Sequence, residues 1–324
     1  MAKILVVGLN PAWQKVLDFQ DFRAGEVNRA KSLSALASGK GINAAKVLRR
    51  LGHEVWLLQV LGGENGKRCL EGCEELGIRS LYAWVEAETR QCITLLHGPG
   101  PSDGSGHPGE FTGPGSSGPG GTTEIIEPFR VRQAGVGEAL LGVLPEDPDF
   151  FDAVVVSGSV PSGIDEGLYE SILESFQPSV TVIDAWKGLG AAALERATCI
   201  KMNQAEFGAL AERMGSQGAG EALFLITSGG GEASMLRSGN TLARLLPPRL
   251  SDLINPIGAG DTVTAGLTHF LLQGLKASEA FRAIPPVQRM ASRPMAPPLW
   301  EFQRADQGRW LFVGPPAKVW SASA

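Results

Sequence analysis

Residues 255–262 read Asn-Pro-Ile-Gly-Ala-Gly-Asp-Thr and precede a run with helical spacing. A turn built on Gly258, Ala259 and Gly260 lets backbone N–H groups point inward together, and the following helix adds its positive dipole end. Such an anion hole suits the charge of a phosphoryl group in transfer, and Asp261 is placed to take a proton from an attacking hydroxyl. The stretch predicts a phosphotransfer site with Asp261 as its base. The alternative is a plain tight turn, with a carboxylate favoured by the helix dipole alone.

The composition is typical of a soluble globular protein. The chain has 324 residues, 19% charged and 43% hydrophobic, with a net charge of −5, and we expect residues 1–324 to form a single α/β domain. The acidic balance argues against nucleic acid as a partner, and no apolar stretch approaches the roughly 20 residues that span a bilayer. The layout of a signal peptide and the spacing of a disulfide framework or a zinc site are missing. These features predict a cytoplasmic protein that does not contact membranes.

Short apolar runs alternate with longer segments of helical spacing. This alternation predicts parallel βαβ units and a doubly wound, Rossmann-like, mostly parallel sheet, which binds ligands at the carboxyl ends of its strands. The expected strands are residues 4–7, 56–61, 153–157, 180–184 and 223–227, and the expected helices are residues 41–51, 66–76, 164–176, 204–214 and 262–275. Asp184 closes one of these strands, and the sequence assigns it no role.

Two segments, residues 14–37 and 89–127, interrupt the alternation. They predict a small β-sheet beside the main domain, placed to act as a lid, because they contain strand-like pieces of mixed polarity. These pieces are residues 15–19, 91–96 and 122–127. Residues 98–121 are dominated by Gly, Pro and Ser, which predicts a flexible loop.

A set of short motifs occurs along the chain. They are residues 9–12 (Leu-Asn-Pro-Ala), 25–29 (Gly-Glu-Val-Asn-Arg), 38–45 (Ser-Gly-Lys-Gly-Ile-Asn-Ala-Ala), 89–90 (Thr-Arg), 122–125 (Thr-Thr-Glu-Ile), 157–163 (Ser-Gly-Ser-Val-Pro-Ser-Gly), 201–206 (Lys-Met-Asn-Gln-Ala-Glu) and 258–261 (Gly-Ala-Gly-Asp). In this order and at these spacings, the chain resembles the PfkB family of carbohydrate kinases, in the ribokinase superfamily, over residues 4–283. It is most similar to the branch of 1-phosphofructokinase and tagatose-6-phosphate kinase.

The resemblance implies a fold, a reaction and a partner. The fold is a ribokinase-like α/β domain with a small β-sheet lid, which the family often uses to form a homodimer. The reaction transfers the γ-phosphate of ATP, with Mg²⁺, to a hydroxyl of a sugar phosphate. Fructose 1-phosphate, fructose 6-phosphate and tagatose 6-phosphate are the expected acceptors, and an unphosphorylated sugar or nucleoside remains open.

By the resemblance, seven residues bind the substrate. A glycine-rich loop and a polar lid residue contact the sugar, and two arginines contact its existing phosphate: Gly39, Lys40, Gly41, Asn43, Gln14, Arg29 and Arg90. The chemistry fits, because glycines admit a ligand close to the backbone and a guanidinium fork matches phosphate oxygens. Without the resemblance, a glycine-rich helix start and two solvated arginines would explain the same residues.

The resemblance assigns a second set of residues to the nucleotide. Asn203 and Glu206 order Mg²⁺ and phosphates largely through water, which suits an ion that keeps several of its waters. A helix N-cap with a capping box gives the same pattern. A loop after the last predicted strand supplies Thr227, Ser228, Gly229 and Gly231, and a generic glycine-rich turn is its alternative.

The chain departs from the family pattern at three places. The family usually has Asp where this chain has Gln14, and an amide hydrogen-bonds hydroxyls without a charge. Ser38 replaces a glycine of the sugar loop. After Ala283, the pair Pro285-Pro286 stops a helix, and helical spacing does not return. The first and third departures motivate a second hypothesis, a catalytically weak sugar-phosphate or nucleotide sensor. A dinucleotide-dependent oxidoreductase fits less well, because residues 8–11 lack the Gly-x-Gly-x-x-Gly fingerprint.

Overall fold

The computed structural model describes residues 1–20, 22–97, 121–165, 167–214, 222–228, 234–238, 241–245, 258–284, 301–305 and 309–313. Within these residues, a nine-stranded sheet has the order β13-β12-β11-β10-β9-β8-β1-β4-β5. Its strands are β1 (Lys3–Val7), β4 (Glu54–Gly62), β5 (Arg79–Val85), β8 (Ala153–Ser157), β9 (Val180–Asp184), β10 (Cys199–Asn203), β11 (Leu223–Thr227), β12 (Ser234–Ser238) and β13 (Thr241–Leu245). All neighbours run parallel except β12, which is antiparallel to β11 and β13. The predicted doubly wound, mostly parallel sheet is confirmed.

The strand order reverses between β1 and β8. From β1 the chain builds outward to β4 and β5, and it later builds in the opposite direction from β8 to β11. The carboxyl ends of two parallel strands flank a crevice at such a point, and α/β proteins bind ligands there. Side chains that follow the two strands meet across it, with Asn10 Nδ2 at 2.9 Å from Ser159 Oγ.

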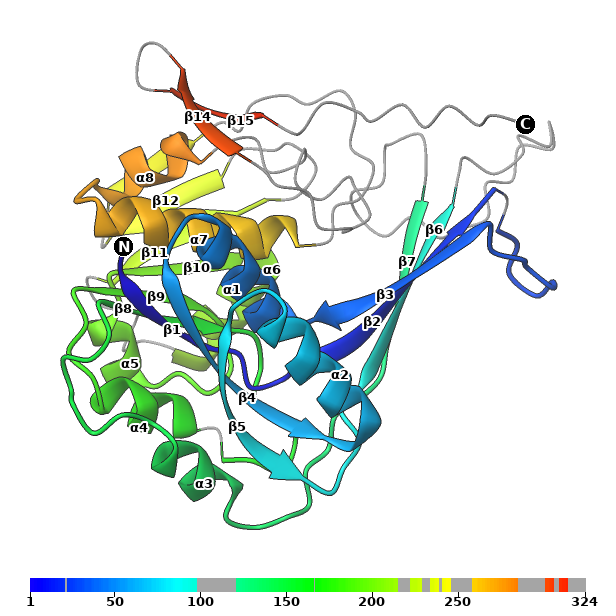
Figure 1. Cartoon of the computed structure of the whole chain (residues 1–324). Coiled ribbons are helices and arrows are strands. Elements are labelled where there is room, and N and C mark those ends of the chain that lie inside the picture. Colours follow the sequence, from blue (N-terminus) through cyan, green and yellow to red (C-terminus); the bar gives the residue numbers. More distant parts are fainter. Residues whose placement is uncertain are drawn as a thin grey trace.

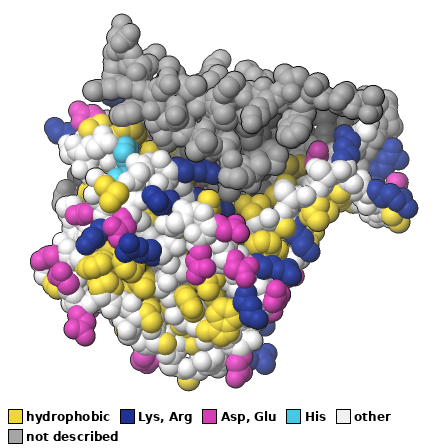
Figure 2. Space-filling view, in the orientation of Figure 1, with side chains coloured by type: hydrophobic (Ala, Val, Ile, Leu, Met, Phe, Trp, Pro, Cys, Tyr) yellow, Lys and Arg dark blue, Asp and Glu magenta, His cyan; other side chains and the backbone are white. Residues whose placement is uncertain are grey.

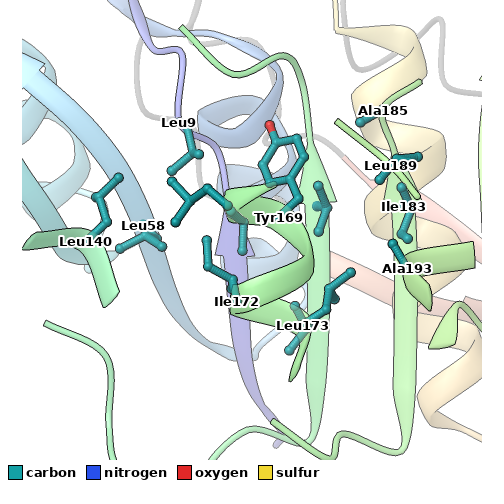
Figure 3. Close-up of a cluster of buried hydrophobic side chains, with 14 of the residues drawn as sticks. Leu9, Leu58, Leu140, Tyr169, Ile172, Leu173, Ile183, Ala185, Leu189 and Ala193 are labelled. Carbon is teal, nitrogen blue, oxygen red and sulfur yellow. The ribbon is translucent and has the colours of Figure 1, made fainter. Parts of the chain in front are cut away.

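Helices cover both faces of the sheet (Figure 1). One layer contains α1 (Lys40–Arg50), α2 (Gly63–Glu74), α7 (Ala259–Leu272) and α8 (Ala277–Ala283), and the other contains α3 (Val136–Gly142), α4 (Leu168–Glu174), α5 (Ala191–Arg196) and α6 (Gln204–Met214). The central strands β1, β8 and β9 are largely apolar and buried, because a strand covered on both faces has no solvent side. Figure 3 shows Tyr169, Ile172 and Leu173 of α4 packed in one of the two resulting cores.

A second sheet projects from the body (Figure 1). Its strand order is β3-β2-β6-β7, with β2 (Ala12–Phe19), β3 (Ser32–Ser38), β6 (Gln91–His97) and β7 (Gly121–Ile126). Strands β2 and β6 pair in parallel, and the outer pairs are antiparallel. The sheet carries exposed hydrophobic side chains, among them Leu33, Ile125 and Ile126. Figure 2 shows hydrophobic side chains along the projection and Lys and Arg near its outer end. The small sheet that the sequence predicts is confirmed.

All five predicted strands of the main sheet exist. Helix α6 has its predicted bounds, and the other predicted helices need correction at their ends. Helix α4 begins at Leu168 and not at residue 164, because a turn precedes it, in which Asp165 accepts the N–H of Gly167 with its side chain and that of Leu168 with its carbonyl. Helix α7 begins earlier than predicted, at Ala259, and ends at Leu272, before Gly274 turns with a φ of 82°. Strands β3, β5, β10, β12 and β13 were not predicted individually. Helix α8 ends at Ala283, as the two prolines require, and a hairpin of β14 (Glu301–Ala305) and β15 (Arg309–Val313) follows. The predicted loop at residues 98–121 lies, except for Gly121, outside the described residues.

Candidate active site

The site is built around Asp261 in the first turn of α7. Gly258 precedes this helix with a φ of 78°, a left-handed conformation that favours glycine, and its carbonyl accepts the N–H of Thr262 at 2.9 Å. The side chain of Asp261 is buried, with the residue only 7% exposed. Its Oδ2 accepts a hydrogen bond from Asn43 Nδ2 at 2.8 Å. The anion-hole turn and its carboxylate are therefore held against α1, which lies beside α7 (Figure 1).

The surroundings of Asp261 change its acidity. Burial raises the pKa of this carboxyl to about 6, and the negative charge of Asp184 acts in the same direction. The hydrogen bond from Asn43 and the ammonium groups of Lys201 and Lys40 oppose the rise. A carboxylate with a pKa near neutrality is ionised at pH 7 and still basic enough to accept a proton, which is what a general base requires.

Asp184, at the end of β9, lies at the centre of the charges. It is fully buried. Its Oδ1 is 3.3 Å from Lys40 Nζ, and its Oδ2 is 2.8 Å from Lys201 Nζ and 2.7 Å from the hydroxyl of Thr264. Burial pushes the pKa of Asp184 upward, but the two ammonium groups and the hydroxyl outweigh it, so the pKa lies below its ordinary range. Asp184 is therefore a permanent negative charge beneath the site.

The glycine loop before α1 is packed too closely to accept side chains. Gly39 has a φ of 110°, and a Cβ there would lie 3.2 Å from the carbonyl oxygen of Asn10. A Cβ on Gly41 would lie 2.4 Å from the Cα of Gly8, so the start of α1 rests directly on the end of β1. This contact fixes Lys40 and Asn43, which the same loop and helix carry, over the crevice between β1 and β8.

Lys40 connects the glycine loop to the predicted nucleotide side. Its ammonium lies 3.3 Å from Glu206 Oε1 as well as 3.3 Å from Asp184. Although burial alone would lower the pKa of Lys40, the charges of Asp184, Glu206 and Asp261 raise it, so the group is a fixed cation. Asn203 and Glu206 bond to each other's backbone N–H at 2.8 and 2.9 Å. This is the reciprocal capping geometry that the sequence left as an alternative. The contact with Lys40 also places Glu206 beside the buried charges around Asp184.

Three further predicted residues have hydrogen-bond partners in the structure. Arg90 is half-buried and donates to the carbonyl oxygens of Asn10 and Pro11 at 3.1 and 3.3 Å. Gln14 is buried on β2, where its Nε2 donates to Thr94 Oγ1 at 2.7 Å. Thr227 Oγ1 donates to the carbonyl of Met202 at 3.3 Å. Ser228 follows at the end of β11, whereas Gly229 and Gly231 lie outside the described residues.

Arg29 is the predicted residue that the structure does not bring to the site. It is exposed in the connection between β2 and β3. Strand β3 then runs from Ser32 to Ser38, immediately before the glycine loop, so Arg29 lies at the opposite end of the small sheet. Arg29 and Asp261 of the same chain therefore lie apart.

Sequence reasoning missed Asp184 as a functional candidate, and also Lys201 and Thr264. A signal existed for each charged residue. Asp184 and Lys201 are the charged members of otherwise apolar strands, and charged side chains are rarely fully buried unless they are paired. The sequence does not show that these two residues pair, because 17 positions separate them.

A family comparison bears on this geometry. A model described as "pfkB family carbohydrate kinase" matches residues 1–101 and 146–283, well over half of the chain. The chain belongs to the pfkB family of carbohydrate kinases. As a member of this family it is an ATP-dependent carbohydrate kinase. The resemblance noted in the sequence is thereby confirmed.

Solved structures share the fold of this chain. A candidate phosphofructokinase from Staphylococcus aureus is 25% identical, with a TM-score of 0.60 over 87% of this chain and 89% of that chain. Phosphofructokinase-2 from Escherichia coli, in complex with substrates and products, is 16% identical, with a TM-score of 0.69 over 90% and 94%. Ribokinase from Thermotoga maritima is 17% identical, with a TM-score of 0.61 over 90% and 94%. These likenesses confirm the ribokinase-like fold.

Two absences hold for the described residues. Their helices include none with the length and apolar character needed to cross a bilayer. They also contain no group of three or more His, Cys, Asp and Glu side chains arranged to hold a metal ion directly.

Proposed function

We propose that this kinase transfers the γ-phosphoryl group of ATP to a hydroxyl of a sugar phosphate, with Asp261 as the general base. The observation that carries the proposal is the buried Asp261 carboxylate, held by Asn43 at 2.8 Å in the first turn of α7. Its pKa of about 6 suits proton transfer at neutral pH. A buried carboxyl group with a raised pKa beside charged partners is a feature that marks functional sites.

The proposed reaction divides its tasks among this chain's residues. Asp261 accepts the proton of the acceptor hydroxyl as the hydroxyl oxygen attacks the γ-phosphorus. The turn at Gly258, Ala259 and Gly260, with the positive end of α7, stabilises the negative charge on the transferring group. Lys40 adds a fixed positive charge close by. Phosphoryl transfer depends mainly on such positioning and charge stabilisation.

The expected Mg²⁺ is compatible with the residues present. Asn203 and Glu206 offer oxygen donors, which Mg²⁺ prefers, but capping bonds and Lys40 already engage them. They therefore fit an ion held through water molecules better than one bound directly. When bound, Mg²⁺ would neutralise charge on the ATP phosphates. Thr227, Ser228, Gly229 and Gly231 remain the proposed nucleotide loop.

The proposed sugar site lies between the glycine loop and the small sheet. Gly39, Gly41 and Asn43 would contact sugar hydroxyls, with Gln14 facing them from the lid, and Arg90 would bind the existing phosphate. The acceptor is proposed to be fructose 1-phosphate, fructose 6-phosphate or tagatose 6-phosphate. The small sheet would close over the site and exclude water, which otherwise would compete as acceptor.

Arg29 has a place in this proposal only if two chains meet. The exposed hydrophobic side chains of the small sheet support a homodimer through this sheet, because such side chains on a projecting surface favour association. Sedimentation of the native protein beside Ile125→Lys and Ile126→Lys variants tests this. A monomeric native protein would remove the support for any role of Arg29 in substrate binding.

A panel of possible acceptors, called the acceptor panel below, tests the proposed function directly. ADP release from MgATP is measured with the three sugar phosphates and with free fructose and tagatose, and the product is identified by ³¹P NMR. We expect turnover with at least one sugar phosphate and far less with the free sugars. Binding of a sugar phosphate without turnover would support the sensor hypothesis that Gln14 motivates.

A further inference from the structure

Asp184 occupies a place that the proposed reaction has not used. It is fully buried at the carboxyl end of β9, one strand away from the crevice between β1 and β8. Both carboxylate oxygens are engaged, Oδ1 by Lys40 and Oδ2 by Lys201 and Thr264. Removing an ion pair from water is costly, so a buried carboxylate with two ammonium partners needs a reason beyond stability.

Lys201 shows what the carboxylate holds in place. Its ammonium lies against the anion-hole turn, because a Cβ on Gly260 would be only 2.9 Å from Lys201 Nζ. Gly260 thus lacks a side chain where the ammonium is situated. Among the described residues, Asp184 is the only carboxylate within ion-pair distance of Lys201. The position of this charge beside the turn therefore depends on Asp184.

Thr264 joins the carboxylate to the turn itself. Its hydroxyl is 2.7 Å from Asp184 Oδ2 and 3.1 Å from the carbonyl oxygen of Gly260. Lys40, on the other carboxylate oxygen, has Glu206 as a second partner at 3.3 Å. Without Asp184, Lys40 would be drawn toward Glu206 alone, and Lys201 would lose its anchor.

We propose that Asp184 is a positioning residue that holds the ammonium groups of Lys40 and Lys201 at the anion-hole turn, so that both charges act on the phosphoryl group in transfer. The inference rests on the proposed function. It assigns Asp184 no contact with the substrate, because the residue is fully buried and both its oxygens are occupied. Its effect on the reaction passes through the two lysines.

A double-mutant cycle tests this dependence. Asp184→Asn keeps the shape and removes the charge, and we expect kcat to fall about 10²-fold, the typical loss from displacing a catalytic group by 1 Å. In the Lys40→Met/Lys201→Met background, the same substitution should change kcat less than about threefold, because the groups that it positions are gone. Thr264→Val is the matched control, since it removes one hydrogen bond to Asp184 and keeps all three charges.

The outcomes separate positioning from plain structure. An unchanged kcat in Asp184→Asn would overturn the proposal, and so would an equal fold-loss in the lysine-free background. A loss in Thr264→Val as large as that in Asp184→Asn would also overturn it. If Asp184→Asn fails to fold, Asp184→Asn/Lys201→Met decides the matter: folding of this pair supports the link to the lysine charge, and failure contradicts it.

A second readout keeps the two proposals distinguishable. Calorimetric binding of MgATP needs no acceptor, so it can be measured even if the native protein turns over none of the sugars. We expect Asp184→Asn to weaken MgATP binding at least tenfold, again only while the lysines are present. If the native protein turns over a sugar phosphate and Asp184→Asn has unchanged MgATP affinity and kcat, only the positioning role is contradicted. If the native protein turns over no sugar phosphate but Asp184→Asn weakens MgATP binding only while the lysines are present, only the proposed function is contradicted.

Discussion

Asn43 Nδ2 donates a 2.8 Å hydrogen bond to Asp261 Oδ2, across 218 positions of sequence. The bond joins the helix that follows the glycine loop to the helix that follows the anion-hole turn. It also favours the ionised form of Asp261, against the effect of burial. One contact thus positions the proposed base and limits the rise of its pKa.

Replacing Asn43 with Ala should shift the pH dependence of the reaction. Without the hydrogen bond, the pKa of Asp261 rises above about 6, so the acid limb of kcat/KM moves to higher pH. The measurement is the pH profile of ADP release between pH 5 and 9. Ser38→Ala is the control, because it removes the 3.3 Å contact to Asn43 Oδ1 and keeps the bond to Asp261. An acid limb that stays in place in Asn43→Ala would contradict this assignment.

The raised pKa of Asp261 also predicts a cost in stability. The folded-state pKa of about 6 exceeds the unfolded value near 3.9, so the native state binds the proton more tightly. The stabilisation of the folded state by protonated Asp261 is fully present below a pH of about 3.9 and is lost as pH rises through about 6. Asp261→Asn removes the buried charge and should raise Tm at pH 8 by a few degrees. Thermal unfolding at pH 5 and pH 8 measures the difference, and a lower Tm for the variant at pH 8 would argue against this account.

Two glycines should respond to alanine in opposite ways. In Gly41→Ala the new Cβ would lie 2.4 Å from the Cα of Gly8, and neither backbone can yield cheaply. We expect a loss of about 1–3 kcal/mol or more in the free energy of unfolding. Gly208 is exposed in α6 with no atom near its Cβ position, so Gly208→Ala should stabilise the protein by about 0.5–1 kcal/mol. Urea unfolding of both variants is the test, and equal effects would refute the close packing of α1 on β1.

A histidine pair predicts acid sensitivity away from the site. His53 Nε2 and His269 Nδ1 are 2.9 Å apart. Burial, with His269 next, lowers the pKa of His53 to about 4, and burial lowers that of His269. The unfolded chain therefore binds more protons, and stability falls as pH drops from about 6.5 to about 4. Between pH 7 and pH 5, the free energy of unfolding of the His53→Gln variant should fall by about 1 kcal/mol less than that of the native protein. Urea unfolding at both pH values measures this, and parallel losses would exclude the pair as the cause.

Much of the fold follows from local sequence, and the gaps have physical reasons. The buried strands β1, β8 and β9 are largely apolar, as a parallel sheet covered on both faces requires. The end of α8 follows from the two prolines after it. Helix α4 was predicted too long because apolar spacing continues back to residue 164, where turn bonds to Asp165 compete with the helix. Periodicity does not report such competition.

The site divides in the same way. The turn before Asp261 and the glycine loop were predicted because small residues and one carboxylate make a local signal. Asp184 and Lys201 were missed because their role depends on a pairing that only the folded sheet creates. Arg29 was included because a motif carries no information on which end of a strand a residue occupies.

The most direct test of the central claim compares the native protein with Asp261→Asn in ADP release from MgATP, using the sugar phosphate that the acceptor panel identifies. The account predicts that kcat falls about 10²–10⁴-fold, the usual cost of removing a general base, while the variant stays folded and binds MgATP. A folded Asp261→Asn protein with a kcat within a few fold of the native value would contradict the role of Asp261.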